Sequence, residues 1–460
     1  VILSFTKLIE HLFRRFLPSP FTIAVLLTIL TMVLAMVFTQ ESSESSKITA
    51  VLSYWESGIW NNGLLVFAYQ MMLILVLGHV LVLSKPMERL MLGITKGVKN
   101  TSTAAVLVVV STMLVSFFNW GLGLIFGAIL ARKVGEHAQA NQIPLNYPLI
   151  GASGYAGLMI WHGGISGSAP LKVAEEGHLQ DLTQDVASSS MAEQLPASIS
   201  TSLTILSSWN LLLFLLIVVA IGFLVFFLGK KTAPTSFHLK KYEFNLMEKK
   251  SLVGAERLDY SKGVALLFGG LLFAAFLVQY LVPLQKLNIT PNMLNFFMLG
   301  LAIVLHGSFK SFLEAVQEAI SDTAGILIQF PLYFGIMGMM TGSGMINSIS
   351  DFFVSISNAT TLPIFTFFSA GLVNIFVPSG GGQWAIQGPL VLESALQLDV
   401  PLPKAIMALA YGDQITNMLQ PFWALPLLGI TKLKAKEILP YTLLFMLVGS
   451  FIYITGLLIL

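Results

Sequence analysis

Two segments of the chain place polar side chains and glycines where the surrounding sequence is almost entirely apolar. The longer segment, residues 374–426, contains NIFVPSGGGQWAIQGP and then AYGDQITNMLQPFWALP. The shorter one comes earlier, as FFNWGLGLIFGAILAR followed by GYAGLMIWHGGISGSAPL. Backbone polar groups cannot stay unpaired in lipid, so segments of this kind must be buried in protein or line a wet cavity. Both segments are therefore predicted to form halves of one substrate site.

Asp413 is the only acidic residue within these motifs, and Gln414 follows it. Ionisable residues inside a membrane segment are functional candidates by default, because a buried charge is costly. Asp413 and Gln414 are therefore predicted to bind the coupling ion of a transporter, either a proton on the carboxylate or Na⁺ held together with backbone carbonyls. The alternative is a structural role, in which Asp413 has Tyr411 or Gln414 as its partner.

The composition places most of the chain in lipid. Of 460 residues, 55% are hydrophobic and 10% are charged, whereas soluble domains average about 25% charged residues. The sequence has no cysteine, which excludes disulfides, thiolate metal sites and cysteine nucleophiles. We therefore predict an all-α polytopic membrane protein, with the lipid bilayer as a partner, no nucleic acid, and no resident cofactor or metal.

The uncharged run 101–131 has the wrong length for a single straight span. As one helix it would reach about 46 Å at 1.5 Å per residue, well beyond the ~30 Å hydrocarbon core. Its centre is Asn119-Trp120-Gly121, and basic residues stand at both ends. Since basic loops stay on the cytoplasmic side, we expect a re-entrant hairpin over 101–131 that enters from inside.

A second uncharged run extends from Phe352 to Leu392 and has acidic flanks. Here we expect a re-entrant hairpin over 361–395 that enters from outside, with the glycines after Ser379 at its tip. Each hairpin is followed by an apolar segment that glycine or polar residues interrupt. These two segments, 147–171 and 403–431, are predicted to be broken transmembrane helices.

The order of these elements divides the chain into two halves. Residues 1–229 are predicted to form an N-terminal repeat of an amphipathic surface helix, spans, hairpin and broken helix. A basic cytoplasmic linker over 230–262 and an extra span over 263–283 separate it from a C-terminal repeat over 284–460. The two sets of elements have opposite orientation, which predicts an inverted repeat with the binding site near the midplane. We expect about nine full spans and two hairpins, with the N-terminus cytoplasmic and the C-terminus periplasmic.

The motifs PSGGGQWAIQGP, AYGDQITNMLQPFWALP, FNWGLGLIFGA and GGISGSAPL resemble those of the bacterial short-chain fatty acid transporter family, the group of the acetoacetate-operon permease. The similarity runs nearly end to end. It implies uptake of short-chain fatty acids such as butyrate or acetoacetate across the bacterial inner membrane, and no enzymatic activity. By analogy with a larger superfamily of ion transporters, it also implies a symporter that forms a homodimer and moves by an elevator mechanism.

A short-chain fatty acid needs a place for one carboxylate and a small apolar space for its tail. No Lys or Arg lies in the predicted core, so helix N-termini, whose N–H groups and positive dipole ends attract anions, are the remaining means of binding. Glycines let backbone amides approach closely, and hydroxyl and amide side chains add neutral donors. The predicted substrate-binding residues are Asn119, Trp120, Gly121, Ser166, Ser168, Ser379, Gly380, Gly381, Gly382, Gln383, Trp384, Thr416 and Asn417.

Other interpretations of the same residues stand beside this one. A transporter of the same fold could carry another organic anion, such as a dicarboxylate, and a passive channel would need no coupling ion. An intramembrane enzyme would need a nucleophile with a base or a metal cluster, and the sequence has no HExxH or GxSxG motif. Gly and Ser are also common at tight helix–helix contacts, and each Trp suits interfacial or core packing.

Overall fold

The computed structural model describes residues 18–39, 46–183, 194–239, 254–285 and 290–459. Within these ranges the regular elements are all helices, which confirms the predicted all-α class. The amphipathic helix predicted at the N-terminus and the middle of the predicted basic linker lie outside the described residues.

Several helices are long and apolar enough to cross a membrane. Among the described residues there are five by length and composition, or six if a bent pair over 47–81 is taken as one span. They are α2 (Pro20–Phe38), α6 (Thr101–Phe118), α12 (Ser208–Lys231), α14 (Lys262–Gln285) and α23 (Ala435–Ile459). The protein is therefore a multi-pass membrane protein, and the larger span count and the inverted repeat stay predictions.

The remaining helices and the 3₁₀ turns, labelled η, connect and surround these spans. In the first half they are α3 (Lys47–Ile59), α4 (Asn62–Leu83), α5 (Lys85–Thr95), α7 (Trp120–Ala140), α8 (Tyr147–Tyr155), η1 (Ala156–Met159), α9 (Ser168–Lys172), α10 (His178–Thr183) and η2 (Thr201–Leu203). In the second half they are α13 (Glu256–Asp259), α15 (Pro291–His306), α16 (Phe309–Ala319), η3 (Ile320–Thr323), α17 (Ala324–Gly342), α18 (Met345–Ser355), α19 (Leu362–Phe376), α20 (Gly380–Gln397), α21 (Leu402–Thr416), η4 (Asn417–Leu419) and α22 (Pro421–Thr431).

Helices α6 and α7 form an antiparallel pair that turns at Asn119. This residue caps α7, because its side-chain Oδ1 accepts a hydrogen bond from the backbone N–H of Leu122 at 2.9 Å. On either side of the turn, Gly123 lies against Ser116, and a Cβ added to Gly123 would be 2.6 Å from the Cα of Ser116. The absence of a side chain at this position lets the two helices pack closely.

Helices α19 and α20 form a second antiparallel pair, joined by residues 377–379. Ser379 caps α20 by accepting a hydrogen bond from the backbone N–H of Gly382 at 3.2 Å. The buried Gln383 of α20 donates from Nε2 to the backbone oxygen of Ala370 in α19 at 2.8 Å. This contact fixes the start of α20 against its partner helix.

Each antiparallel pair is followed by a broken helix. This broken helix crosses one helix of the pair, and the two backbones approach closely at a glycine. In the first half, a Cβ on Gly127 of α7 would lie 2.0 Å from the carbonyl oxygen of Gly154 in α8. In the second half, a Cβ on Gly412 of α21 would lie 2.1 Å from the carbonyl oxygen of Phe367 in α19. Neither space accommodates a methyl group, so both crossings depend on glycine.

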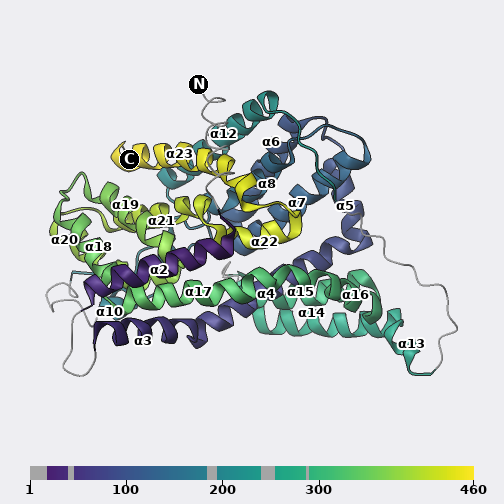
Figure 1. Cartoon of the computed structure of the whole chain (residues 1–460), viewed down its shortest axis with the longest axis horizontal. Helices are drawn as coiled ribbons and strands as arrows, with labels where there is room; N and C mark the ends of the chain where they lie inside the picture. Colours follow the sequence, from purple (N-terminus) through teal and green to yellow (C-terminus); the bar gives the residue numbers. More distant parts are fainter. Residues whose placement is uncertain (1–17, 40–45, 184–193, 240–253, 286–289, 460) are drawn as a thin grey trace.

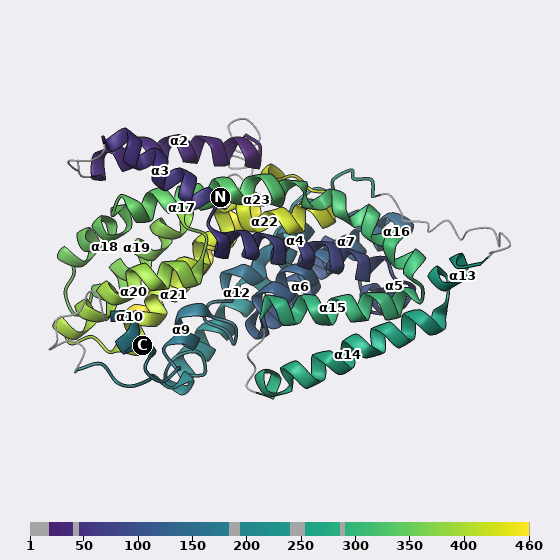
Figure 2. The same cartoon turned by 90° about the horizontal axis from the view of Figure 1, so that it is seen from below.

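Segments far apart in the sequence meet in the middle of the molecule. Figures 1 and 2 show α14, α15 and α16 toward one end and α18, α19 and α20 at the other, with α22 between them. Arg132 of α7 donates from Nη1 to the backbone oxygen of Ile430 at 2.8 Å, and Tyr147 donates to that of Thr431 at 3.0 Å. The last carbonyls of α22, which have no partner within their own helix, are thereby satisfied by the first half.

Hydrophobicity does not reveal helix α3, because its sequence KITAVLSYWESGI mixes apolar and polar residues. It packs along α17 through glycines. A Cβ on Gly338 would lie 2.4 Å from the backbone oxygen of Tyr54, and one on Gly58 would lie 2.5 Å from that of Phe334. Close packing against α17 stabilises α3, and the sequence of α3 alone does not indicate this packing.

Gly127→Ala tests the crossing of α7 and α8. The added methyl group would overlap the carbonyl oxygen of Gly154, and overpacking of this kind costs about 1–3 kcal/mol. We expect a lower unfolding temperature for the purified protein in detergent. Gly270→Ala is the matched control, since nothing lies within 4 Å of a Cβ there. Equal unfolding temperatures for wild type and Gly127→Ala would contradict the crossing.

Candidate functional site

The turns of the two helical pairs reach the same aromatic cluster. The ring of Trp120, the first residue of α7, lies 6.0 Å from that of Trp161 and 5.3 Å from that of Trp423. A Cβ on Gly380, the first residue of α20, would lie 2.8 Å from Cη2 of Trp161. Trp161 follows the break after η1, and Trp423 belongs to α22. The N-termini of α7 and α20 therefore converge on one indole.

Neutral donors and small residues surround these two helix N-termini. Ser166 accepts a hydrogen bond on Oγ from the backbone N–H of Trp120 at 2.9 Å. Ser168 faces the other helix, since a Cβ on Gly381 would lie 4.0 Å from its Oγ. The first N–H groups of a helix have no acceptor within the helix. Gly381 is exposed and the two serines are half-buried, so part of this cluster of N–H and O–H groups lies at the surface of the protein.

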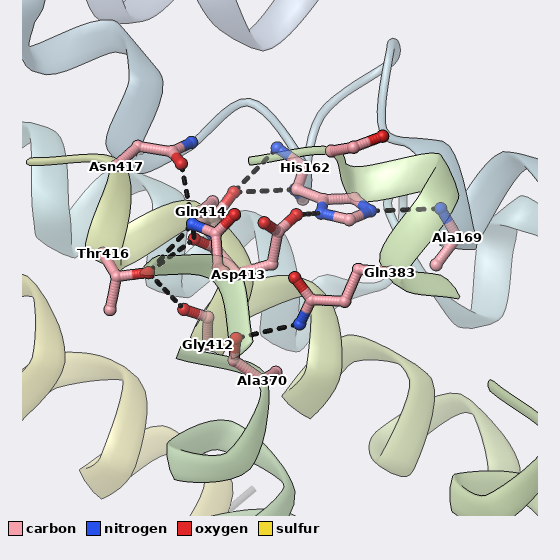
Figure 3. Close-up of polar contacts among 12 residues, drawn as sticks. His162, Ala169, Ala370, Gln383, Gly412, Asp413, Gln414, Thr416 and Asn417 are labelled. Carbon is pink, nitrogen blue, oxygen red and sulfur yellow. Dashed lines mark hydrogen bonds and ion pairs between the residues drawn. The ribbon is translucent and has the colours of Figure 1, made fainter. Parts of the chain in front are cut away.

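Asp413 pairs with His162, and both side chains are almost fully buried, at 1% and 0% exposure (Figure 3). The carboxylate Oδ2 of Asp413 contacts Nδ1 of His162. The other ring nitrogen, Nε2, accepts a hydrogen bond from the backbone N–H of Ala169 at 3.1 Å. An acceptor at Nε2 places the proton of a neutral imidazole on Nδ1, which then donates to the carboxylate.

His162 is a functional candidate that the sequence did not single out. The partner of Asp413 is His162, whereas Tyr411, one of the expected partners, donates to Oδ1 of Asn210 at 2.6 Å. His162 lies in the break of the first half, at the start of GGISGS. The available signal was that it is the only histidine within the four polar motifs.

Gln414, in the second half, is the hydrogen-bond acceptor for backbone N–H groups at the helix break in the first half. Its Oε1 accepts hydrogen bonds from the backbone N–H groups of His162 and Gly163 at 2.7 and 3.0 Å, and its Nε2 donates to the hydroxyl of Tyr453 at 2.7 Å. Tyr155 of the first half donates in return to the backbone oxygens of the break after α21. The polar atoms of the Gln414 side chain therefore all have protein partners.

Gln383 and Trp384 lie beside the cluster with their polar atoms bonded elsewhere. Gln383 is bonded to α19, as described above, and Nε1 of Trp384 donates to Nε2 of His178 in α10 at 3.0 Å. Burial, followed by the charge of Lys172, lowers the pKa of His178, and nearby acidic groups oppose this shift. Neutral His178 keeps the lone pair that accepts this hydrogen bond, so α10 stays tied to α20.

Thr416 and Asn417 face the amide of Asn374 rather than the aromatic cluster. Nδ2 of Asn374 lies 2.9 Å from Oγ1 of Thr416, 2.8 Å from Oδ1 of Asn417 and 2.6 Å from the backbone oxygen of Asp413. Nε2 of Gln420 in turn donates to the backbone oxygen of Asn374. These residues form a second polar cluster behind the Asp413–His162 pair, next to the ends of α19 and α21.

Converging helix ends beside a buried ionisable pair are an arrangement typical of membrane transporters with broken helices. The profile of the short chain fatty acid transporter family matches residues 1–460. A protein of Escherichia coli (strain K12) named as a short-chain fatty acid transporter is 35% identical over 464 residues, covering 98% of both chains. One of Haemophilus influenzae with the same name is 35% identical over 449 residues, covering 96% of both. The chain belongs to the short-chain fatty acid transporter family, which confirms the resemblance of its motifs and the prediction that it is not an enzyme.

Two solved structures are also similar to the chain. The YdaH transporter of Alcanivorax borkumensis matches with a TM-score of 0.43 and 13% identity, covering 96% of this chain and 97% of that one. MtrF of Neisseria gonorrhoeae matches with a TM-score of 0.41 and 14% identity, covering 98% and 97%.

His162→Leu tests the buried pair. Leucine fills the space of the imidazole without a donor, so Asp413 stays buried and loses its partner, a change that costs about 3–5 kcal/mol. We expect a matching loss of stability against denaturant in detergent. The double variant His162→Leu/Asp413→Leu removes both polar groups and should lose less than the two single variants added together. Additive losses would show that the two side chains do not interact.

Proposed function

We propose that the protein is a secondary active transporter that carries short-chain monocarboxylates such as butyrate or acetoacetate across the bacterial inner membrane. The observation that supports it best is the convergence of the N-termini of α7 and α20 on Trp161, beside the Asp413–His162 pair. The first feature suits an anion, and the second suits a coupling ion.

The carboxylate of the substrate binds to neutral donors in this proposal. Two positive helix ends and the N–H groups of their glycines receive it, helped by the hydroxyl groups of Ser166, Ser168 and Ser379. Arg132, the first basic residue along α7, lies about 18 Å further on at 1.5 Å per residue. With no fixed positive side chain, the site favours one negative charge over two, which disfavours a dicarboxylate.

The tail of the substrate lies among indole rings. Trp120, Trp161 and Trp423 form a small apolar wall with centroid separations of 5.3 and 6.0 Å. Burying a CH₂ group is worth about 0.8 kcal/mol, so such a wall adds affinity for a tail of a few carbons. Asn119 caps α7 at the turn behind it, and Gly121 supplies a backbone N–H of the first turn of α7.

The coupling ion in this proposal is a proton on Asp413. A Cβ on Gly380 would lie 3.0 Å from Oδ2 of Asp413, so the aspartate carboxylate stands at the N-terminus of α20, where the substrate carboxylate would bind. Two negative charges compete for one positive helix end, and protonation of Asp413 removes this competition. Substrate and proton then bind together, which is the requirement for symport. Na⁺ is the alternative coupling ion.

We also propose that the transport cycle is one of alternating access. The hairpins and broken helices carry the binding groups of each half, and we propose that they form inverted repeats that move together in an elevator mechanism within a homodimer. In this proposal the N-terminus lies in the cytoplasm and the C-terminus in the periplasm, an orientation that the distribution of basic loops supports under the positive-inside rule.

Uptake of radiolabelled butyrate into proteoliposomes tests the substrate and the mode of transport. We expect accumulation above the external concentration when a proton gradient is imposed, because a symporter uses the gradient to concentrate its substrate. Unlabelled acetoacetate should compete and succinate should not. Equilibration without accumulation would indicate a passive channel, and no uptake under either a proton or a Na⁺ gradient would refute the assignment.

Asp413→Asn tests the proposed proton site. The amide resembles the protonated carboxyl in shape and charge, so the variant should bind butyrate within about tenfold of wild type, a difference of about 1.4 kcal/mol, and should lose accumulation driven by a proton gradient. Asp351→Asn makes the same change at an exposed position of α18 and should accumulate butyrate normally. Full pH-dependent accumulation by Asp413→Asn would show that the coupling proton binds elsewhere.

A further inference from the structure

A groove opens on the protein surface between the start of α2 and the turn that joins α22 to α23. Residues 18–20 line one side, and Leu428 together with residues 433–436 lines the other. In both Figures 1 and 2 one end of α2 lies beside α22. The groove has a volume of about 350 Å³, and pockets that bind small ligands commonly measure about 300–1,000 Å³. Segments from opposite ends of the sequence thus enclose a space of ligand size.

The side chains that line this groove carry positive charge. Lys434 and Lys436 belong to the lining, and the described residues contribute no Asp or Glu to it. Neither lysine forms an ion pair within the described part of the chain. The carboxylate of Glu437 accepts a hydrogen bond from the backbone N–H of Lys434 at 2.7 Å, so the ammonium group of this lysine takes no part in that contact. Two lysine charges are therefore available to a ligand in the groove.

Two helix N-termini add to the positive potential of the groove. Ser19 is the N-cap of α2 and Pro20 is its first residue, while α23 begins at Ala435. The N-terminus of a helix carries a partial positive charge, and its first N–H groups have no acceptor within the helix. Helix N-termini are favourable places for phosphate groups for this reason. The groove therefore favours an anion.

The rest of the lining is apolar and continues into a surface that faces lipid. Leu428 and Leu433 belong to the lining, as do the two prolines before and at the start of α2. Both α2 and α23 are candidate membrane spans, so their first residues lie at the level of the lipid headgroups. Beyond the groove, α2 exposes a row of large apolar side chains, namely Phe21, Leu26, Ile29 and Leu30. A ligand that matches both regions has an anionic head and an apolar chain.

We propose that an anionic phospholipid binds in this groove, with its phosphate at Lys434 and Lys436 and an acyl chain along the exposed face of α2. Basic pockets between transmembrane helices bind acidic lipid headgroups, and lysine binds phosphate as a point charge. A zwitterionic headgroup brings an ammonium group that the two lysines repel, so the groove selects a headgroup of net negative charge. The bound lipid connects the first span to the turn that follows the broken helix.

The experiment is a thermal unfolding titration of the purified full chain in detergent, with phosphatidylglycerol or phosphatidylcholine of the same acyl chains. A ligand that binds only the folded state raises the unfolding temperature in a saturable manner. We expect this rise with phosphatidylglycerol and not with phosphatidylcholine. An equal rise with both lipids would show a general effect of lipid and overturn the proposal. An equal rise with inorganic phosphate would assign the groove to free phosphate and overturn it as well.

Variants of the two lysines locate the site. Lys434→Gln/Lys436→Gln removes both charges and should weaken the apparent affinity for phosphatidylglycerol about tenfold or more. Lys434→Arg/Lys436→Arg keeps the charges and should respond like wild type. The matched control is Lys230→Gln/Lys231→Gln, which removes two exposed lysines at the end of α12, outside the groove. Equal weakening by both glutamine pairs would show diffuse attraction to basic residues and overturn the placement.

A second variant and a second measurement keep the test decisive. Should the double variant not fold, Lys434→Gln alone changes one exposed side chain and should also weaken the response. Native mass spectrometry should show phosphatidylglycerol retained on wild type and lost from Lys434→Gln/Lys436→Gln. A lipid-free double variant of lower unfolding temperature, together with a wild type that does not respond to lipid, would show that the chain itself fills the groove and would overturn the proposal.

The lipid site does not depend on the proposed transport function. Lipid binding is measured without substrate, and the groove contains none of the residues proposed to bind butyrate or the proton. If butyrate uptake is found and phosphatidylglycerol binding is not, the lipid site fails and the transport function stands.

Discussion

A helix that breaks in apolar surroundings leaves backbone groups that must find partners in protein, because lipid offers none. In this chain each half supplies partners for the break in the other half. Gln414 of the second half accepts from the backbone N–H groups of residues 162–163 at 2.7 and 3.0 Å. Tyr155 of the first half donates to the backbone oxygens of Asn417 and Gln420 at 2.8 and 3.1 Å. Since neither break is satisfied alone, the two halves must fold against each other for the site to exist.

The same breaks separate charge across the middle of the protein. The N-termini of α7 and α20 bring positive helix ends to Trp161, and the C-termini of α19 and α21 bring negative ends to Asn374. The Asp413–His162 pair stands between these two regions, with Gly380 on one side and the Asn374 cluster on the other. The glycine crossings at Gly127 and Gly412 hold the broken helices near enough for this arrangement.

Much of this organisation follows from local rules that act on the sequence. Glycine and polar residues interrupt helices in apolar runs, so NWG and SGGG mark turns, and the structure begins α7 at Trp120 and α20 at Gly380. The roles of individual side chains follow less directly. Gln383 and Trp384 stand one turn from the glycine tip and looked like site residues, yet helix periodicity turns them toward α19 and α10. The position of a residue in the sequence indicates whether its backbone lies near a site. Whether its side chain contacts that site depends on the direction in which the side chain points.

The sequence by itself determined the class of protein, the places where helices break, the lack of Lys and Arg in the predicted core and the family, because each is set by composition or by neighbouring residues. Only the tertiary structure decided the partners. It paired Asp413 with His162, and it assigned Thr416 and Asn417 to Asn374 instead of to the aromatic cluster. Such pairings join residues of different helices, and the packing angle and rotation of each helix fix them. Those two quantities depend on close contacts, such as the glycine crossings, that no local pattern specifies.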